Sequence, residues 1–293
     1  MELLSIKGQS STVRGIKMPI NFVTTRPIDY HCDCDYCTKK YSGELKQPNG
    51  TYYSARARTG YSPKEKEIKH LCPGHWEGYA FVVEQFSQPG ELVFDPCAGS
   101  GTALIEAIKI GRGGVGIELE FFEILKANCD LYPGSFHIVQ GDARVELKNI
   151  FEQVDLIVTG TPYNNNSDAP ERKNLATKQN LSFNYSDQSN LAFLKDKEYF
   201  DEIGKLYQEC IKKLRVGGHF VIIIKDPIRK KAPYLLHKLI TDRVLQDNKM
   251  EVTNVFIHKH YPPTLFISTY AKQYPGVRVP KYQTMVVMKK VGE

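Results

Sequence analysis

Short apolar runs alternate with helix-like segments along most of the chain. The runs lie at Leu92–Phe94, Val115–Ile117, Phe136–Val139, Leu156–Val158 and Phe220–Ile224. Helix-like segments separate them at Leu104–Ile110, Phe121–Cys129 and Tyr199–Leu214. This alternation is typical of a parallel sheet with crossover helices. After a further helical segment, Tyr234–Leu245, the runs Val252–Ile257 and Met285–Met288 predict an antiparallel hairpin at the sheet edge, which makes seven strands in all.

The organisation changes at about residue 70. We expect an N-terminal region over residues 1–69, poor in hydrophobic periodicity, and an α/β domain over residues 70–293. Within that domain, residues 164–198 form an insertion, and its first part is rich in Asn, Ser, Asp, Lys and Gln. Long segments of this kind are usually functional or disordered. We interpret the insertion as a lid that recognises a target.

Length, charge and apolar content are those of an ordinary globular protein and do not by themselves indicate its function. The 293 residues suffice for one large core with a small appendage. The net charge of +6 is mild and suits a polyanionic partner only weakly. No apolar run approaches the ~20 residues of a membrane helix, and the first residues lack the apolar core of a signal peptide. We therefore expect an intracellular, cytoplasmic protein without a membrane partner.

The sharpest signal is a glycine-rich turn after the first predicted strand. The strand ends in Asp95, the chain turns through Gly99 and Gly101, and a helix opens at Thr102. Glycines allow close approach of a ligand, and helix N-termini favour anionic groups. A dinucleotide site would need a third glycine and a P-loop would need Gly-Lys-Ser/Thr, so NAD and ATP are disfavoured. The residues predicted to line a cofactor site are Asp95, Pro96, Cys97, Ala98, Gly99, Ser100, Gly101 and Thr102.

Two further acids follow neighbouring strands. Glu118 ends the second strand, where a carboxylate can accept hydrogen bonds from two ribose hydroxyls. Asp142 follows the third strand and can accept from an adenine amino group. An acid after a strand is also a common helix cap. Three such acids in register favour a nucleoside-binding edge.

These segments resemble the amino-methyltransferases, the family of DNA N4-cytosine and N6-adenine methylases. The resemblance rests on Asp-Pro-Cys-Ala-Gly-Ser-Gly-Thr from Asp95, Gly-Ile-Glu-Leu from Gly116, and Gly-Asp-Ala from Gly141. It implies a Rossmann-like seven-stranded sheet and an S-adenosylmethionine site that also includes Ala143 and Thr159. The family carries Lys-His-Pro before the first strand; Lys69-His70 stands at a similar distance here, with Leu71 in place of proline. The resemblance covers roughly residues 69–290.

The resemblance also implies a catalytic tetrapeptide after the fourth strand. The family carries Asp, Asn or Ser, then Pro, Pro, and Tyr or Phe; this chain has Gly160, Thr161, Pro162 and Tyr163. Acceptors there would activate an amino nitrogen, and the aromatic ring would stack on an extruded base. Because Gly160 has no acceptor, we expect backbone carbonyls of Gly160 or Thr161, with the Thr161 hydroxyl, to replace it. An ordinary turn is the alternative interpretation.

A cysteine cluster near the N-terminus predicts a metal site. Its candidates are Cys32, Cys34, Cys37, Cys72 and His75. Short-spaced soft ligands separated by a loop suit tetrahedral zinc. Either the four cysteines bind together, or Cys34, Cys37, Cys72 and His75 form the set. Free thiols are the alternative.

The sequence thus predicts an S-adenosylmethionine-dependent enzyme that methylates an exocyclic amino group in nucleic acid, with N4 of cytosine in DNA favoured and zinc as a structural ion. Structured RNA, such as ribosomal RNA, is the rival substrate, and adenine N6 the rival target. A second hypothesis is a catalytically inactive, zinc-containing nucleic-acid-binding protein. A third is methylation of a protein glutamine. The oligomeric state stays open.

Overall fold

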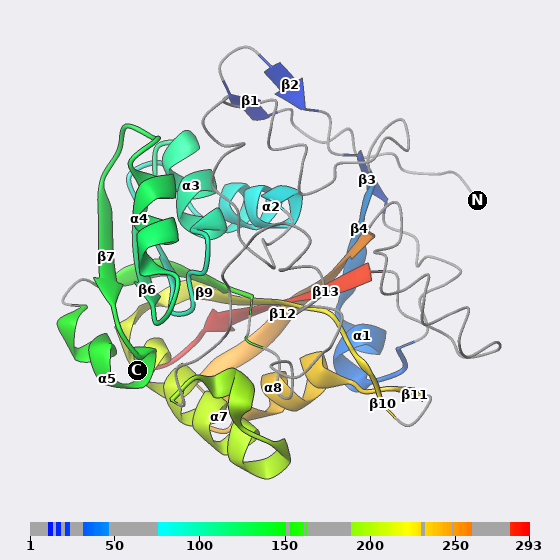
Figure 1. Ribbon diagram of the computed structural model, residues 1–293. Helices are drawn as coiled ribbons and strands as arrows, with labels where there is room; N and C mark the ends of the chain where they lie inside the picture. The colour runs from blue at the N-terminus through cyan, green and yellow to red at the C-terminus, as the bar shows by residue number, and fades with distance from the viewer. Residues whose placement is uncertain are drawn as a thin grey trace, which may run out of the picture.

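A computed structural model describes residues 11–13, 16–18, 21–23, 32–46, 76–150, 153–160, 162, 189–229, 232–247, 249–259 and 282–293. Within these residues a central twisted sheet carries helices on both faces (Figure 1). The seven strands that the hydrophobic pattern predicts all occur in it: β5 (Leu92–Asp95), β6 (Gly113–Glu118), β7 (Phe136–Gln140), β8 (Val154–Thr159), β9 (Leu214–Ile224), β12 (Met250–Lys259) and β13 (Tyr282–Lys290).

The order of these strands reverses direction inside the sheet, at β5. The order is β12-β13-β9-β8-β5-β6-β7, and β5 pairs in parallel with both β6 and β8. Strand order reverses at β5, where open α/β sheets bind their ligands beyond the carboxyl ends. β13 runs antiparallel to β9 and to β12. The expected Rossmann-like α/β sheet is confirmed.

The predicted position of the hairpin is wrong. β12 and β13 do pair antiparallel, but β12 is not an edge strand. β4 (Tyr41–Lys46) pairs with it in parallel and β3 (Asn21–Val23) pairs with β4, so the sheet has nine strands among the described residues. The backbone groups of β12 are satisfied because the N-terminal segment covers them. Two small pairs, β1 (Ser11–Val13) with β2 (Ile16–Met18) and β10 (Ile228–Arg229) with β11 (Ala232–Pro233), lie apart from this sheet.

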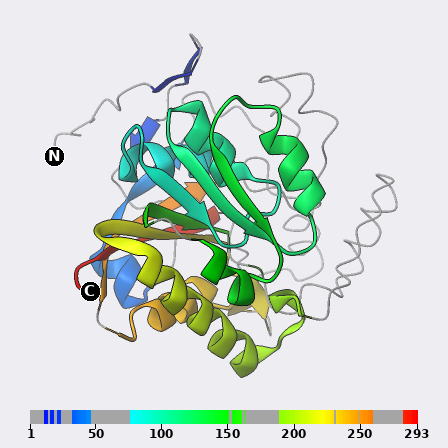
Figure 2. The same cartoon turned by 90° about the vertical axis from the view of Figure 1, so that its left-hand side faces the viewer.

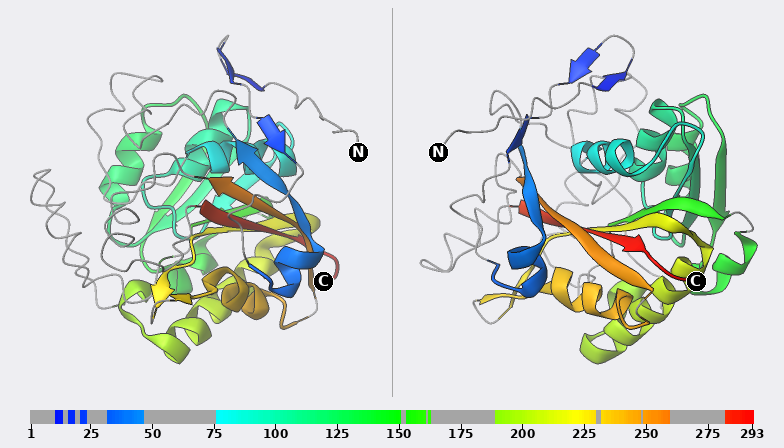
Figure 3. Two further views of the ribbon diagram at one scale, coloured as in Figure 1. Left: turned by 90° about the vertical axis from the view of Figure 1, so that its right-hand side faces the viewer. Right: turned by 180° about the vertical axis from the view of Figure 1, so that it is seen from behind.

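Helices cover both faces of the sheet, as the turned views show (Figures 2 and 3). One layer contains α2 (Trp76–Phe86), α3 (Thr102–Lys109) and α4 (Phe122–Cys129). The other contains α1 (Asp35–Lys39), α5 (Ala143–Glu146), α7 (Asp196–Lys213) and α8 (Leu236–Val244). Short 3-10 turns lie at Leu147–Asn149 and Leu191–Phe193.

Two separate cores result from the alternation of side chains along the buried strands. Phe94, Ile157 and Phe220 pack with α7 and α8, whereas Val93 and Leu156 pack with α2 and α3. Buried apolar side chains on both faces explain why these strands read as continuous apolar runs. The two cores hold the carboxyl ends of β5, β6 and β8 in fixed positions.

Candidate active site

The glycine-rich turn lies at the carboxyl end of β5, as expected. Gly99 and Gly101 have positive φ angles of 55° and 83°, which L side chains rarely adopt. The N–H of Ala98 donates to the carbonyl of Ile117 at 2.9 Å, and this bond ties the turn to β6. Gly101 is the N-cap of α3, so the first turn of that helix points its N–H groups toward this edge. The turn has the backbone geometry of an anion- or nucleoside-binding loop.

Glu118 holds this turn from the neighbouring strand. One carboxylate oxygen accepts the N–H of Gly99 at 2.7 Å, and the other accepts the N–H groups of Glu120 and Phe121, each at 3.0 Å. A carboxylate has about four acceptor positions, so three bonds leave room for one more donor. Glu118 is nearly buried, at 9% exposure. It therefore shapes the turn and keeps an acceptor for a ligand hydroxyl.

Asp95 is the buried acid of the site. One carboxylate oxygen accepts the N–H of Cys97 at 3.0 Å, and only 3% of the residue is exposed. Burial raises the pKa of Asp95 to about 7, although the Cys97 N–H and the Thr159 hydroxyl favour the charged form. Burial and the neighbouring carboxylates likewise raise the pKa of the Cys97 thiol well above its ordinary value. Both shifts show that burial disfavours the charged forms of these two groups, and a cation at this edge would stabilise the charged Asp95 carboxylate.

Asp142 lies at the end of β7 as predicted, but it is already engaged. It is the N-cap of α5, where its carboxylate accepts the backbone N–H of Arg144 at 2.9 Å. The Arg144 guanidinium binds the same carboxylate at 2.5 Å and also contacts Glu202 at 3.1 Å. The helix-cap interpretation therefore holds for Asp142. An adenine amino group would have to share an acceptor that Arg144 already occupies.

Gly160 and Pro162 follow β8 at the same edge. β8 pairs with β5 through Phe94 and Ile157, its last residue Thr159 interacts with Asp95, and Gly160 and Pro162 follow the strand end. The carbonyl of Pro162 accepts a 2.5 Å hydrogen bond from the hydroxyl of Tyr199, which is fully buried on α7. The remaining residues of the turn, Pro96, Ser100 and Thr102, and Ala143 of α5 lie within the described elements. Thr161, Tyr163 and His70 lie outside the described residues.

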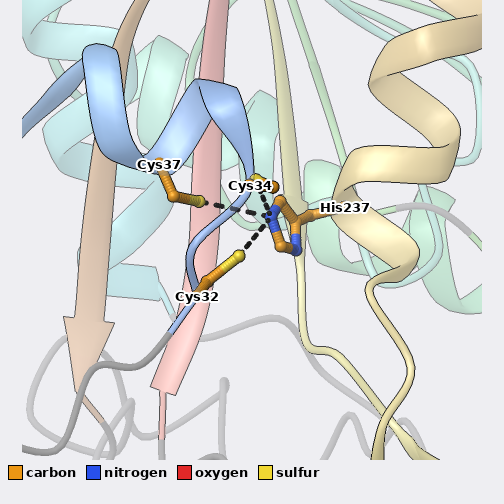
Figure 4. A group of neighbouring side chains, drawn as sticks. All are labelled: Cys32, Cys34, Cys37 and His237. Atoms are coloured by element: carbon orange, nitrogen blue, oxygen red, sulfur yellow. Dashed lines mark hydrogen bonds between the residues drawn. The ribbon is translucent and has the colours of Figure 1, made fainter.

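A second cluster joins the N-terminal segment to α8 (Figure 4). The sulfurs of Cys32, Cys34 and Cys37 lie 3.5, 3.4 and 3.3 Å from Nε2 of His237, and all four ligand atoms lie within 4.8 Å of one another. Zinc at about 2.3 Å from sulfur and about 2.0 Å from nitrogen gives a tetrahedral edge of about 3.5 Å between them. The three distances match that edge, so the cluster has the dimensions of a Cys₃His zinc site.

Asp226 fixes the orientation of the histidine. One of its carboxylate oxygens lies 2.7 Å from Nδ1 of His237, and the other accepts the backbone N–H of His237 at 3.1 Å. This contact places the ring proton on Nδ1 and leaves Nε2 facing the three sulfurs. Contacts with the Cys32 and Cys37 thiols, together with His237, hold the pKa of Cys34 far below its ordinary value, which favours the metal-binding thiolate.

Three of the five predicted metal ligands thus come together, and the fourth ligand was not predicted. Cys72 and His75 lie outside the described residues. His237 lies about 200 residues after the cysteines in the sequence. It falls within an amphipathic helical pattern, in which a histidine is usually interpreted as a core residue. A weak local signal was Asp226, an acid two residues after the end of the apolar strand β9. No spacing rule connects two segments so far apart.

Within the described part of the chain, no helix has the length and apolar character to cross a membrane.

Comparison with known proteins gives one family model and one curated relative that each match about a third of the chain. Residues 34–127 match the family model of N6 and N4 methyltransferases, described as DNA methylase. YubD of Escherichia coli (strain K12), described as a methylase, is 33% identical over 97 residues, which are 31% of this chain and 38% of YubD. The chain therefore matches well under half of the length of that relative.

The chain is also similar to two solved structures. TrmN from Thermus thermophilus has a TM-score of 0.45 at 15% identity, covering 74% of this chain and 48% of TrmN. A methyltransferase from Pyrococcus furiosus has a TM-score of 0.44 at 14% identity, covering 74% of this chain and 83% of that chain.

Proposed function

Because the family match and the methylase relative support an S-adenosylmethionine-dependent amino-methyltransferase family, we propose that this chain methylates an exocyclic amino group of a nucleic-acid base. N4 of cytosine in DNA is the favoured target, and structured RNA is the rival substrate. One observation carries the proposal: Asp95, Glu118 and Gly160 lie at the carboxyl ends of three adjacent strands, β5, β6 and β8. The matched residues 34–127 contain the first two of them.

The residues present fit the cofactor. Gly99 and Gly101 form a backbone cradle that only glycine adopts easily, and Glu118 keeps one acceptor position for a ribose hydroxyl. Asp95 offers a buried carboxylate, and a sulfonium cation nearby would favour its charged form. Glu118 would also suit the ribose of a dinucleotide, but the second carboxylate, Asp95, would repel the phosphates of a dinucleotide or a triphosphate. The two acidic acceptors therefore favour S-adenosylmethionine over a phosphorylated cofactor.

Bound S-adenosylmethionine would supply an electrophilic methyl group. The amino nitrogen would provide the electron pair of the new C–N bond, sulfur would keep the pair of the C–S bond, and the proton lost by the nitrogen would pass to solvent. The chain contributes position and electrostatics, because a base amino group is a weak nucleophile. Oxygen acceptors at the end of β8 orient that group and stabilise its developing positive charge. Tyr199 holds the Pro162 carbonyl in place from α7. Tyr163 is proposed to stack on the base.

Methyl transfer to candidate nucleic acids tests this function. The protein is incubated with methyl-deuterated S-adenosylmethionine and duplex DNA, single-stranded DNA or total RNA, and the nucleosides are analysed by mass spectrometry. We expect labelled N4-methylcytosine from DNA. Label in RNA alone would move the proposal to the rival substrate. Label in a protein fraction, with none in nucleic acid, would favour glutamine methylation instead.

The rival of another class is an inactive zinc-containing protein that binds nucleic acid. The loss of an acceptor at Gly160 is the observation that favours it. Titration calorimetry with S-adenosylmethionine separates the two classes, with Glu118→Ala as the variant that should lose the cofactor. Absence of binding by the wild-type protein, together with retained binding of nucleic acid, would favour the rival.

We further propose that Cys32, Cys34, Cys37 and His237 bind one structural zinc ion. Four protein ligands close the tetrahedron and leave no position for substrate, which is typical of structural rather than catalytic zinc. The ion would link the N-terminal segment to α8. We expect one zinc per chain by elemental analysis of the purified protein and a clear loss in the Cys37→Ser variant. A zinc content unchanged in that variant would contradict the site.

A further inference from the structure

The space beside Gly160 is occupied by the hydroxyl of Tyr79. A Cβ atom built on Gly160 would lie 2.4 Å from Oη of Tyr79 and 3.8 Å from its Cζ. The difference equals one carbon–oxygen bond, so the C–O bond of the phenol points end-on at that position. No side chain fits at residue 160 while Tyr79 stays where it is. Gly160 and Tyr79 therefore form a matched pair.

Tyr79 is held firmly in this position. It lies on α2, is 6% exposed, and belongs to the core formed with Leu156 and Val158 of β8 and Ile223 of β9. Because α2 packs on the strand that ends at Gly160, the ring reaches the carboxyl edge of the sheet from one helical layer. Its hydroxyl is thus part of the same edge as Asp95 and Pro162.

The distance from a Cβ at residue 160 to the Tyr79 hydroxyl matches the reach of the acceptor side chain that the family carries at this position. In a family member with Asp or Asn here, the side-chain oxygen lies about 2.4 Å from its own Cβ, from C–C and C=O bond lengths of about 1.52 and 1.23 Å. We propose that the Tyr79 hydroxyl replaces the missing acceptor at position 160 and accepts a hydrogen bond from the amino group that is methylated. This inference rests on the proposed function.

A phenol oxygen suits this role. It has lone pairs that accept a hydrogen bond while the hydroxyl proton is directed elsewhere. It stabilises positive charge on the amino nitrogen as the new bond forms, and it is already desolvated and oriented, so it needs no reorganisation during the reaction. Glycine is then required at position 160 for steric reasons. The Tyr79 hydroxyl from α2 occupies the space that a side chain at residue 160 would need.

Exchanging the two partners tests the assignment. Tyr79→Phe removes the oxygen and keeps the ring, and its Cζ would lie at an ordinary contact distance of 3.8 Å from a Cβ at residue 160. Gly160→Ser can therefore be combined with Tyr79→Phe without a clash. Tyr207→Phe is the matched control, because Tyr207 is also fully buried but lies on α7 against Phe220.

We expect Tyr79→Phe to lower kcat of methyl transfer about 100-fold, in line with loss of one preorganised polar group, while Kd for S-adenosylmethionine stays within twofold. Gly160→Ser alone should lose transfer because its side chain displaces Tyr79. The double variant should recover at least tenfold over Tyr79→Phe, and Tyr207→Phe should keep wild-type kcat.

The possible results separate this inference from the proposed function. Wild-type kcat in Tyr79→Phe, or a double variant no better than Tyr79→Phe, overturns the role of Tyr79 and leaves the methyltransferase proposal standing. A wild-type protein that transfers no methyl group to any nucleic acid overturns both. An equal loss of kcat in Tyr207→Phe would show a general effect on folding, and would also contradict the assignment.

Discussion

The hydroxyl of Tyr199 donates a 2.5 Å hydrogen bond to the carbonyl oxygen of Pro162, and so helix α7 holds the chain directly after β8. Tyr199 is fully buried, and its ring packs edge-on against Phe200 with centroids 5.2 Å apart. The carbonyl it binds belongs to the proposed catalytic tetrapeptide. A helix remote from the glycine-rich turn thus fixes the other half of the site.

Removing this hydrogen bond should loosen the tetrapeptide more than the fold. We expect Tyr199→Phe to lower the free energy of unfolding by about 1 kcal/mol, the usual net contribution of one hydrogen bond. The rate of methyl transfer should fall about tenfold with unchanged affinity for S-adenosylmethionine, because the cofactor turn does not depend on this contact. Denaturant unfolding and steady-state kinetics measure the two effects. A loss of stability without loss of kcat would show that the bond serves the fold alone.

Glu118 should determine cofactor affinity through the shape of the turn. Glu118→Gln removes the charge and one of the two oxygens that accept the N–H groups of Gly99, Glu120 and Phe121. At least one of these donors then loses its partner, at a cost of about 1–3 kcal/mol. We expect the Kd for S-adenosylmethionine to rise at least tenfold in calorimetry. Glu123→Gln, at an exposed position on α4, is the control and should bind like the wild type; equal Kd values for all three proteins would refute this role.

The pKa of Asp95 predicts how stability depends on pH. Its carboxyl titrates near 7 in the folded protein and near 3.8 when unfolded, so the folded state binds the extra proton between these values. Stability should therefore fall as pH rises through this window, by at most about 1.4 kcal/mol per pH unit, and level off above about pH 7. The Asp95→Asn variant lacks this group. Between pH 5 and pH 8 the wild type should lose up to about 3 kcal/mol more unfolding free energy than Asp95→Asn does.

Denaturant titrations of both proteins at pH 5 and pH 8 measure this difference, because other titrating groups are common to both and cancel. The comparison is made without cofactor, since a bound sulfonium would favour the charged carboxylate. Parallel pH profiles for the two proteins would mean that Asp95 is solvated or paired in the folded state, contrary to its burial.

The parts of this fold that could be predicted are those encoded by local pattern. β5, β8 and β9 bury apolar side chains on both faces, and the turn from Asp95 to Thr102 has glycines where the backbone needs positive φ angles. β4 escaped prediction because Tyr41–Lys46 alternates weakly and joins the sheet through distant β12. His237 and Tyr79 escaped for a similar reason: the partners that suggest their proposed roles lie far along the chain, and each resembles a core residue of a helix in its local sequence.

The carboxylate behind the proposed zinc ligand gives the most selective test of the metal site. Asp226→Asn keeps the size of the side chain but weakens the contact that directs Nε2 of His237 toward the cysteines. Loss of such an outer partner typically lowers metal affinity 10- to 100-fold. In competition with a chromophoric zinc chelator, we expect Asp226→Asn to release zinc at correspondingly lower chelator concentration than the wild type. Asp247→Asn, an exposed aspartate beyond α8, is the control and should match the wild type.

Release of zinc should then free the N-terminal segment before the rest of the sheet. Cys32 and Cys34 precede α1, Cys37 lies within it, and β4 directly follows and pairs in parallel with β12. Without the ion, hydrogen exchange should accelerate in residues 35–46 and α8. β5, β6 and β8 should stay protected, because β12, β13 and β9 separate them from β4 in the sheet. Uniform acceleration across the whole sheet would mean that the ion stabilises the entire fold, and no acceleration would mean that the cluster holds together without metal.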